Sequence, residues 1–180
     1  MNFWGLCLKC AGWKVNITVP ARNKTVICVA PHTSNWDFIA GLFAYRSLGR
    51  KANFLMKKFW FFFPLNYIFK SLGGIPVDTK SSQSLTSKII NDFQQRNYLN
   101  LAVTPEGSRS GVEKWKTGFL TIAFNANVPI QLGVIDFKNK TVRINKEFIP
   151  TGDNQKDLKE IRKYYSEFKE AAKYPENFII

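Results

Sequence analysis

The chain of 180 residues is long enough for one domain with a hydrophobic core and too short for two of ordinary size. Its composition, 45% apolar and 15% aromatic, excludes a mainly disordered protein, because disordered chains contain few aromatic residues. With 26 Lys and Arg against 13 Asp and Glu, the net charge of +13 indicates a polyanionic partner: nucleic acid, an anionic bilayer or a phosphorylated substrate.

Strand and helix patterns alternate along the chain. Short β-branched runs bounded by Gly, Pro or Asn predict five strands: Lys24–Ala30, Ala52–Met56, Gly74–Val77, Tyr98–Thr104 and Pro129–Asp136. Helical spacing between them predicts four helices: Asn35–Leu48, Leu65–Leu72, Gln83–Arg96 and Gly118–Asn127. Strands that alternate with helices need crossover connections, so we expect a single α/β domain with a largely parallel central sheet flanked by helices.

The remaining segments lie at the two ends of this core. Residues 1–13 form an apolar N-terminal segment, and the motif-bearing core spans about residues 24–150. Lys140–Ile149 is predicted to be a strand that pairs antiparallel with Pro129–Asp136. Residues 154–174 are predicted to form a lysine-rich amphipathic helix whose apolar stripe packs on the core. Because no repeat or linker divides the chain, we expect residues 1–180 to be one domain.

No segment of the sequence predicts a transmembrane helix. The most apolar stretch, Phe59–Phe69, has only eleven residues and is bracketed by Lys57, Lys58 and Lys70, whereas a helical span needs about twenty apolar residues. The N-terminus also lacks the pattern of a signal peptide. We therefore expect a peripheral, monotopic protein on the cytoplasmic face of a membrane, held by lysines and by aromatic residues that insert shallowly. The alternative is that these aromatic residues are core.

Three cysteines, Cys7, Cys10 and Cys28, are an odd number in a chain that needs no disulfide to fold, which favours a reducing compartment. Cys7 and Cys10 have metal-ligand spacing, but the sequence holds no second cysteine pair and a single histidine. A closed zinc site is therefore not expected, and we predict no metal site.

Two loops that follow predicted strands contain residues suited to catalysis or ligand binding. Their position fits such roles, because ligands in such folds gather beyond the carboxyl ends of the strands. In the first loop, His32 precedes a helix whose first turn holds Asp37. A carboxylate bonded to one ring nitrogen fixes the tautomer of an imidazole and stabilises the imidazolium that forms when it accepts a proton. The pair therefore predicts a general base. The alternative is a helix-capping Asp37 beside a polar turn residue.

The second loop, which follows Tyr98–Thr104, contains Glu106, Gly107, Ser108 and Arg109. Gly permits close backbone approach, Ser offers a hydroxyl, and the planar guanidinium of Arg matches a phosphate. This combination predicts an anion site, with Glu106 holding the loop or the arginine in place. The alternative is a turn with a surface ion pair.

Four segments of the sequence resemble motifs of the glycerolipid acyltransferases, and they occur in the order that the family has. APHTSNWD matches their H-x4-D first motif, and TPEGSRS matches the third; LGGIPVD at 72–78 and VPIQLGVID at 128–136 resemble the second and fourth. The resemblance covers roughly residues 26–136 and is to the lysophosphatidic acid acyltransferase superfamily. It implies a glycerol-3-phosphate acyltransferase-like fold and transfer of a fatty acyl group to a lipid hydroxyl at a membrane surface.

The resemblance also assigns roles to residues of this sequence. It places the general base at His32 and its orienting carboxylate at Asp37. It places acceptor binding at Glu106, Gly107, Ser108 and Arg109, and in the second motif at Gly74. The arginine common at the end of that motif is replaced by Thr79, and the next residue, Lys80, offers a point charge in its place.

The implied donor is an acyl-CoA or an acyl carrier protein thioester, which acts as a co-substrate, and no cofactor is expected. The implied acceptor is a lysophospholipid such as 1-acyl-glycerol-3-phosphate. Because a thioester is already activated, direct attack without an acyl-enzyme suffices. Thr79 leaves open a different lysolipid or an aminolipid acceptor. A basic nucleic-acid-binding module is the remote alternative, although no recognisable motif for nucleic acid is present and no nucleic acid partner is expected.

Overall fold

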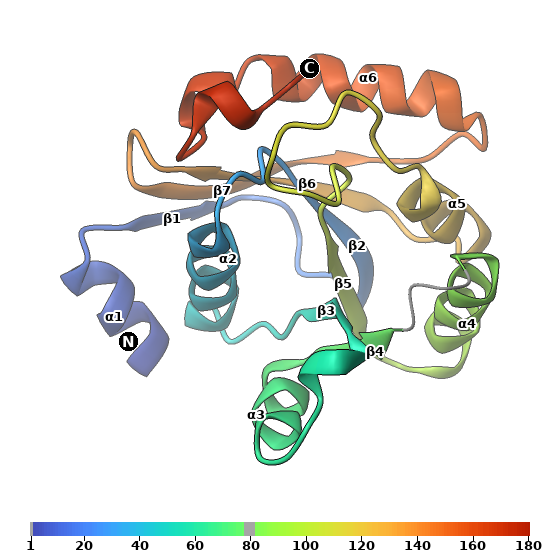
Figure 1. Cartoon of the computed structure of the whole chain (residues 1–180), viewed down its shortest axis with the longest axis horizontal. Coiled ribbons are helices and arrows are strands. Elements are labelled where there is room, and N and C mark those ends of the chain that lie inside the picture. Colours follow the sequence, from blue (N-terminus) through green and yellow to red (C-terminus); the bar gives the residue numbers. More distant parts are fainter. Residues whose placement is uncertain (1, 78–81) are drawn as a thin grey trace.

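The computed structural model describes residues 2–77 and 82–180, which form a seven-stranded sheet in the order β1-β7-β6-β2-β5-β3-β4 (Figure 1). All neighbouring strands are parallel except β6 and β7, which are antiparallel, as predicted. The strands are β1 Lys14–Ile17, β2 Lys24–Val29, β3 Asn53–Lys57, β4 Gly74–Val77, β5 Leu99–Val103, β6 Ile130–Asp136 and β7 Thr141–Phe148. The α/β fold class is therefore confirmed.

Helices cover both faces of the sheet because the central strands are apolar on both sides. One face is covered by α1 Phe3–Cys10 and α2 Asn35–Ser47, whose inward residues pack against Ile135 and Val142. The other face is covered by α4 Ser82–Gln95, α5 Gly118–Asn125 and α6 Asn154–Ser166. Figure 1 shows α6 along one side of the sheet and α1 and α2 on the opposite side.

The remaining helix, α3 Leu65–Leu72, follows a single 3-10 turn at Lys58–Trp60 and has no buried residue. It projects from the sheet next to β3 and β4 in Figure 1. Among the residues that the structure describes, no helix has the length and apolar character needed to cross a membrane.

The sequence prediction missed or misplaced three elements at the ends of the chain. It assigned no structure to residues 1–17, where α1 is followed by β1, which extends the sheet beside β7. The predicted helix over residues 154–174 is wrong at its C-terminal end, because α6 ends at Ser166 and two short 3-10 turns follow. Beyond the end of the helix, the carbonyl of Ala171 accepts a hydrogen bond from Phe137 N at 2.8 Å, which ties this segment to the end of β6. Such a tertiary contact leaves no periodic signal in the sequence.

The apolar stripe predicted for the C-terminal helix does pack on the core, and it anchors the strands that carry the site. Tyr165 is fully buried, and its hydroxyl donates a 2.6 Å hydrogen bond to the carbonyl of Cys28 in β2. The same hydroxyl lies 3.3 Å from the carbonyl of Gly133 in β6. Helix α6 therefore fixes two adjacent strands just before the carboxyl end of β2.

Candidate active site

The site is built where the loops after β2 and β5 meet. These two strands are parallel neighbours, with Cys28 opposite Val103, so their carboxyl ends lie at one edge of the sheet. The backbone N–H of His32 donates a 2.8 Å hydrogen bond to Glu106 Oε1, which joins the two predicted motif loops directly. Residues 74 positions apart in the sequence are thus brought together.

His32 and Asp37 face each other within the first loop. The buried His32 Nδ1 lies 3.1 Å from Asp37 Oδ2. The His32 side chain is 17% exposed and the Asp37 side chain 3%. Because Nδ1 points toward the carboxylate, Nε2 is the ring nitrogen left to receive a proton from a substrate.

The start of α2 explains how a spacing of five residues brings this pair together. Ser34 is the N-cap, and its side chain accepts a hydrogen bond from Trp36 N. Asp37 in the first turn reaches back, and its Oδ2 accepts hydrogen bonds from Thr33 N and Ser34 N, each at 2.8 Å. Asp37 therefore caps its helix, which confirms the capping interpretation, and it also contacts His32, so the general base stays a prediction.

Glu106 is a buried carboxyl group, 3% exposed. Burial raises the pKa of Glu106 to about 8, the nearby Asp37 adds to the rise, and the hydrogen bond from His32 N opposes it. The carboxyl group is therefore largely protonated at neutral pH. Its observed contact is with the backbone of His32, so it positions the loop rather than pairing with Arg109.

Gly107 has a left-handed backbone, with φ of +64°, and its missing side chain leaves room for Lys116. A Cβ atom at this position would come within 2.8 Å of both Cε and Nζ of Lys116. The Lys116 N–H donates a 2.8 Å hydrogen bond to the carbonyl of Pro105, which folds the loop back on itself. Lys116 is thus a cation at the site that the sequence did not predict, because eight residues of irregular loop separate it from Gly107.

Arg109 is exposed and reaches across to α2, where its Nη1 donates a hydrogen bond to Asn35 Oδ1. Asn35 is three residues from His32 in the chain, so this contact holds the guanidinium beside the first loop. Ser108 is half-buried and contacts Ser110 instead, through its own hydroxyl and the Ser110 N–H, so it shapes the turn. The loop predicted to bind an anion therefore presents Arg109 and Lys116.

The C-terminal segment supplies a third cation that the sequence analysis missed. Lys173 Nζ lies over the rings of Trp36, Phe137 and Tyr174, at 5.4, 5.9 and 5.6 Å from their centroids. The Tyr174 N–H donates a 3.2 Å hydrogen bond to Thr33 Oγ1 in the first loop. Only the folding of the chain after α6 brings Lys173 here, so no local pattern predicts it.

Within the described part of the second motif, Gly74 lies away from these loops, at the opposite end of its strand. Gly74 begins the edge strand β4, and a Cβ atom there would come within 2.8 Å of the carbonyl oxygen of Phe69. Its role in the structure is therefore close packing between α3 and β4. Lys80 and Thr79 lie outside the described residues.

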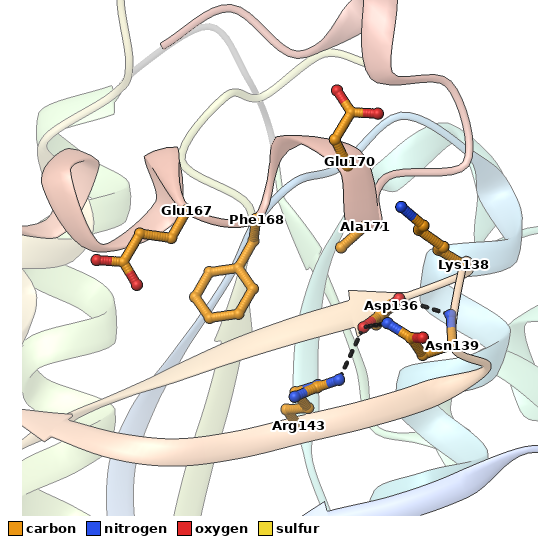
Figure 2. A pocket seen from close by; sticks show the side chains of 8 residues that line it. All are labelled: Asp136, Lys138, Asn139, Arg143, Glu167, Phe168, Glu170 and Ala171. Carbon is orange, nitrogen blue, oxygen red and sulfur yellow. Dashed lines mark hydrogen bonds and ion pairs between the residues drawn. The ribbon is translucent and has the colours of Figure 1, made fainter.

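A separate hollow of about 410 Å³ lies beside the hairpin of β6 and β7 and the turn after α6 (Figure 2). Its central carboxylate, Asp136, accepts hydrogen bonds from Arg143 Nη2 at 2.9 Å and from the backbone and side chain of Asn139 at 2.8 Å. Because Asp136 is paired within the hairpin and none of these groups belongs to the motif loops, the hollow is a structural feature of the hairpin. Within residues 2–77 and 82–180, no three His, Cys, Asp or Glu side chains cluster as metal ligands do.

A half-buried histidine paired with a buried aspartate beside a cationic loop, at the carboxyl ends of parallel strands, is the kind of site that enzymes of group transfer use. A family model described as Acyltransferase matches residues 14–134. The match spans more than half of the chain, so the protein belongs to this acyltransferase family, within the glycerolipid acyltransferase superfamily. No curated protein matches the chain.

Proposed function

We propose that this acyltransferase moves a fatty acyl group from an acyl-CoA or acyl carrier protein thioester to the hydroxyl of a lysophospholipid such as 1-acyl-glycerol-3-phosphate. His32 acts as the general base. The observation that carries the proposal is the 3.1 Å contact between His32 Nδ1 and Asp37 Oδ2, which leaves Nε2 for the substrate. His32 is the only histidine in the chain, so no other imidazole competes for the role.

The proposed reaction is a direct transfer between two bound substrates. The acceptor hydroxyl gives its proton to His32 Nε2 as its oxygen attacks the thioester carbonyl carbon, forming a tetrahedral intermediate. The intermediate collapses with cleavage of the C–S bond, and the imidazolium returns the proton to the departing thiolate. The products are the acylated lipid and the free thiol, and no cofactor is consumed.

Asp37 stabilises the imidazolium that forms during this step. Its own position is fixed by the N–H groups of Thr33 and Ser34, so the carboxylate does not have to reorganise when His32 becomes charged. This arrangement supports a rate effect of Asp37 that is separate from substrate binding.

A covalent intermediate on cysteine is not needed, and the position of Cys28 argues against one. Cys28 lies in β2 and is fully buried, and burial raises the pKa of its thiol to about 12. Its thiolate is therefore not populated at neutral pH. Cys7 and Cys10 lie in α1, which packs on α2 rather than against the motif loops.

The anionic headgroup of the acceptor is proposed to bind Arg109 and Lys116, with Lys80 as a further cation from the second motif. Arg109 is tied to the N-terminal turn of α2 through Asn35, so a phosphate held there lies beside His32. A guanidinium and an ammonium in one loop match a phosphate monoester better than a neutral headgroup. This chemistry favours a phosphorylated lysolipid over an aminolipid.

The test is an acyl-transfer assay with purified protein, a panel of lysolipids and both donor types. We expect acylation of 1-acyl-glycerol-3-phosphate above that of lysolipids with neutral or amine-bearing headgroups. Purified His32→Ala protein, checked for folding by circular dichroism, serves as the blank. Preferred acylation of an aminolipid would show that the acceptor is an aminolipid instead of a phosphorylated lysolipid. Full activity of His32→Ala would refute the mechanism.

A further inference from the structure

An exposed apolar surface on the α1–α2–α3 side of the molecule has no partner within the described residues. It includes the aromatic face, which we define as Phe59, Trp60, Phe62, Phe63, Tyr67 and Ile68. Every one of these side chains is between 47% and 79% exposed. Large apolar residues gathered in one segment at this exposure indicate an interaction site, because monomeric soluble proteins rarely leave such patches uncovered.

The aromatic face extends to α1 through Arg46, at the C-terminal end of α2. Arg46 Nη2 donates a 2.9 Å hydrogen bond to the carbonyl of Ser71 in α3, and its guanidinium lies 5.0 Å from the centre of the Trp4 ring in α1. Asn2 Nδ2 donates in turn to the carbonyl of Arg46 at 2.9 Å. Three helices that are separate in the sequence are thereby held around one arginine.

Helix α1 presents an apolar side outward as well. Trp4 faces inward and packs edge-on against Phe43 of α2, at 4.9 Å between ring centres. Phe3 and Leu6, one helical turn apart, are 67% and 48% exposed. Next to this junction Leu48 is also exposed, so apolar side chains lie on both sides of Arg46.

Helix α2 exposes apolar residues as well, near the site. Trp36 and Ile39 are one turn apart on α2 and exposed, and Trp36 directly precedes Asp37 in the chain. Exposed apolar side chains therefore also lie next to the loop that holds His32.

The part of the chain that carries this surface is strongly basic. Residues 1–77, which form α1, α2, α3 and the aromatic face, contain ten Lys and Arg and a single acidic residue, Asp37, which is buried. Residues 78–180 contain 16 basic and 12 acidic residues. Lys57, Lys58 and Lys70, which flank the aromatic face, are all exposed. Most of the net charge of +13 thus belongs to the segment that exposes the apolar residues.

We propose that this surface docks on an anionic lipid bilayer, with the aromatic face and the outer side of α1 in the headgroup region and the lysines against acidic headgroups. A second copy of the chain fits less well, because it would set lysines against lysines. The proposal extends the proposed function, since a lysolipid acceptor resides in a bilayer, but binding requires no turnover.

The experiment is flotation with vesicles of phosphatidylglycerol and phosphatidylcholine, and with phosphatidylcholine alone. Binding to the anionic vesicles is expected to exceed binding to the neutral ones. It should weaken between 0.1 and 1 M salt, where the Debye length falls from about 10 Å to about 3 Å. A remainder that resists salt is expected from the aromatic face.

Two pairs of variants separate the contributions. Lys57→Gln with Lys58→Gln should lower the partition coefficient on anionic vesicles about fivefold for each lysine removed. Phe62→Ser with Phe63→Ser should lower the salt-resistant part at least tenfold. The matched controls lie elsewhere on the molecule: Lys156→Gln with Lys159→Gln on α6 makes the same change in net charge, and Ile149→Ser with Ile180→Ser removes exposed apolar groups. Both controls should bind as the wild type does.

The result that overturns the proposal is equal vesicle binding by the surface variants and their controls, all shown to be folded by circular dichroism. Self-association of the wild type that disappears in Phe62→Ser with Phe63→Ser, without a change in vesicle binding, would assign the surface to a second copy instead. His32→Ala should bind vesicles normally. Loss of its turnover thus reports on the proposed function, while vesicle binding reports on the surface.

Discussion

The two loops of the site are held in different ways, although they lie side by side. The loop after β2 is organised by its own residues, because Asp37 accepts hydrogen bonds from Thr33 and Ser34 and contacts His32. The loop after β5 is held from outside, because Glu106 accepts a hydrogen bond from His32 N and Arg109 donates one to Asn35 of α2. The first loop is thus self-contained, and in terms of the proposed function we call it the proton-transfer unit; the second depends on contacts with the first loop and with α2 to place Glu106 and Arg109. Changes in the two loops should therefore have separable effects on rate and on acceptor binding.

The largest effect is expected from the proton-transfer unit. His32→Ala should lower kcat roughly a hundredfold to ten-thousandfold, because the acceptor hydroxyl loses its base. Asp37→Asn should lower kcat less, since the base remains while the charge that stabilises its protonated form is gone. Steady-state kinetics with saturating acceptor measure both. An increase in acceptor KM at unchanged kcat would place the pair in binding rather than in catalysis.

Glu106, which connects the loops, should make stability depend on pH. Its folded-state pKa of about 8 lies above its unfolded value of about 4.5, so the folded state binds the proton more tightly. Its contribution is therefore fully present below about pH 4.5 and is lost as the pH rises to about 8. Glu106→Gln keeps an acceptor for His32 N and removes this titration. As the pH rises from about 4.5 to about 8, the free energy of unfolding of the variant should therefore increase relative to that of the wild type, by on the order of a few kcal/mol.

Urea unfolding at several pH values, followed by tryptophan fluorescence, measures this difference. The expected signature is a wild-type stability that falls more steeply than that of Glu106→Gln over the range. Parallel pH profiles would mean that Glu106 is ionised in the folded protein. The close contact of its Oε1 with His32 N would then be that of a carboxylate.

In the externally organised loop, Arg109→Ala should raise the acceptor KM about tenfold to a hundredfold with little change in the donor KM. The reason is that a charge-assisted hydrogen bond contributes about 1.5–3 kcal/mol. Arg22→Ala is the matched control, because it removes an exposed arginine that pairs with Glu147 rather than with the site. Equal acceptor KM values in the two variants would mean that the headgroup binds elsewhere.

The smallest effect is expected at Gly107. Gly107→Ala places a Cβ atom at φ of +64° and displaces the end of the Lys116 side chain, which costs about 1–2 kcal/mol of stability and raises the acceptor KM. Gly49→Ala is the control, because Gly49 has φ of +72° and a Cβ atom there would meet nothing within 4 Å. Both variants should lose stability, and only Gly107→Ala should change acceptor binding. A KM change shared by both would reflect general destabilisation.

The sequence predicted the alternation of strands and helices because each central element has a local signature. Buried strands such as β2 and β6 are short apolar runs, and α2 begins at a Ser34 cap and ends before Gly49. The end of α6 and the presence of α1 and β1 were not predictable in this way. The position of β1 is set by its pairing with β7, a contact with a distant segment.

For the site, the sequence by itself determined the proton-transfer unit. His32, Ser34 and Asp37 fall within six residues, and helix capping at short range is enough to bring the carboxylate back to the imidazole. Only the tertiary structure decided that Glu106 hydrogen-bonds the backbone of His32, and that Lys116 and Lys173 lie at the site. It also left Gly74 in an edge strand, away from the motif loops. The physical reason is that a sequence pattern records neighbours along the chain, whereas strand order and the path of the C-terminal segment bring distant residues together.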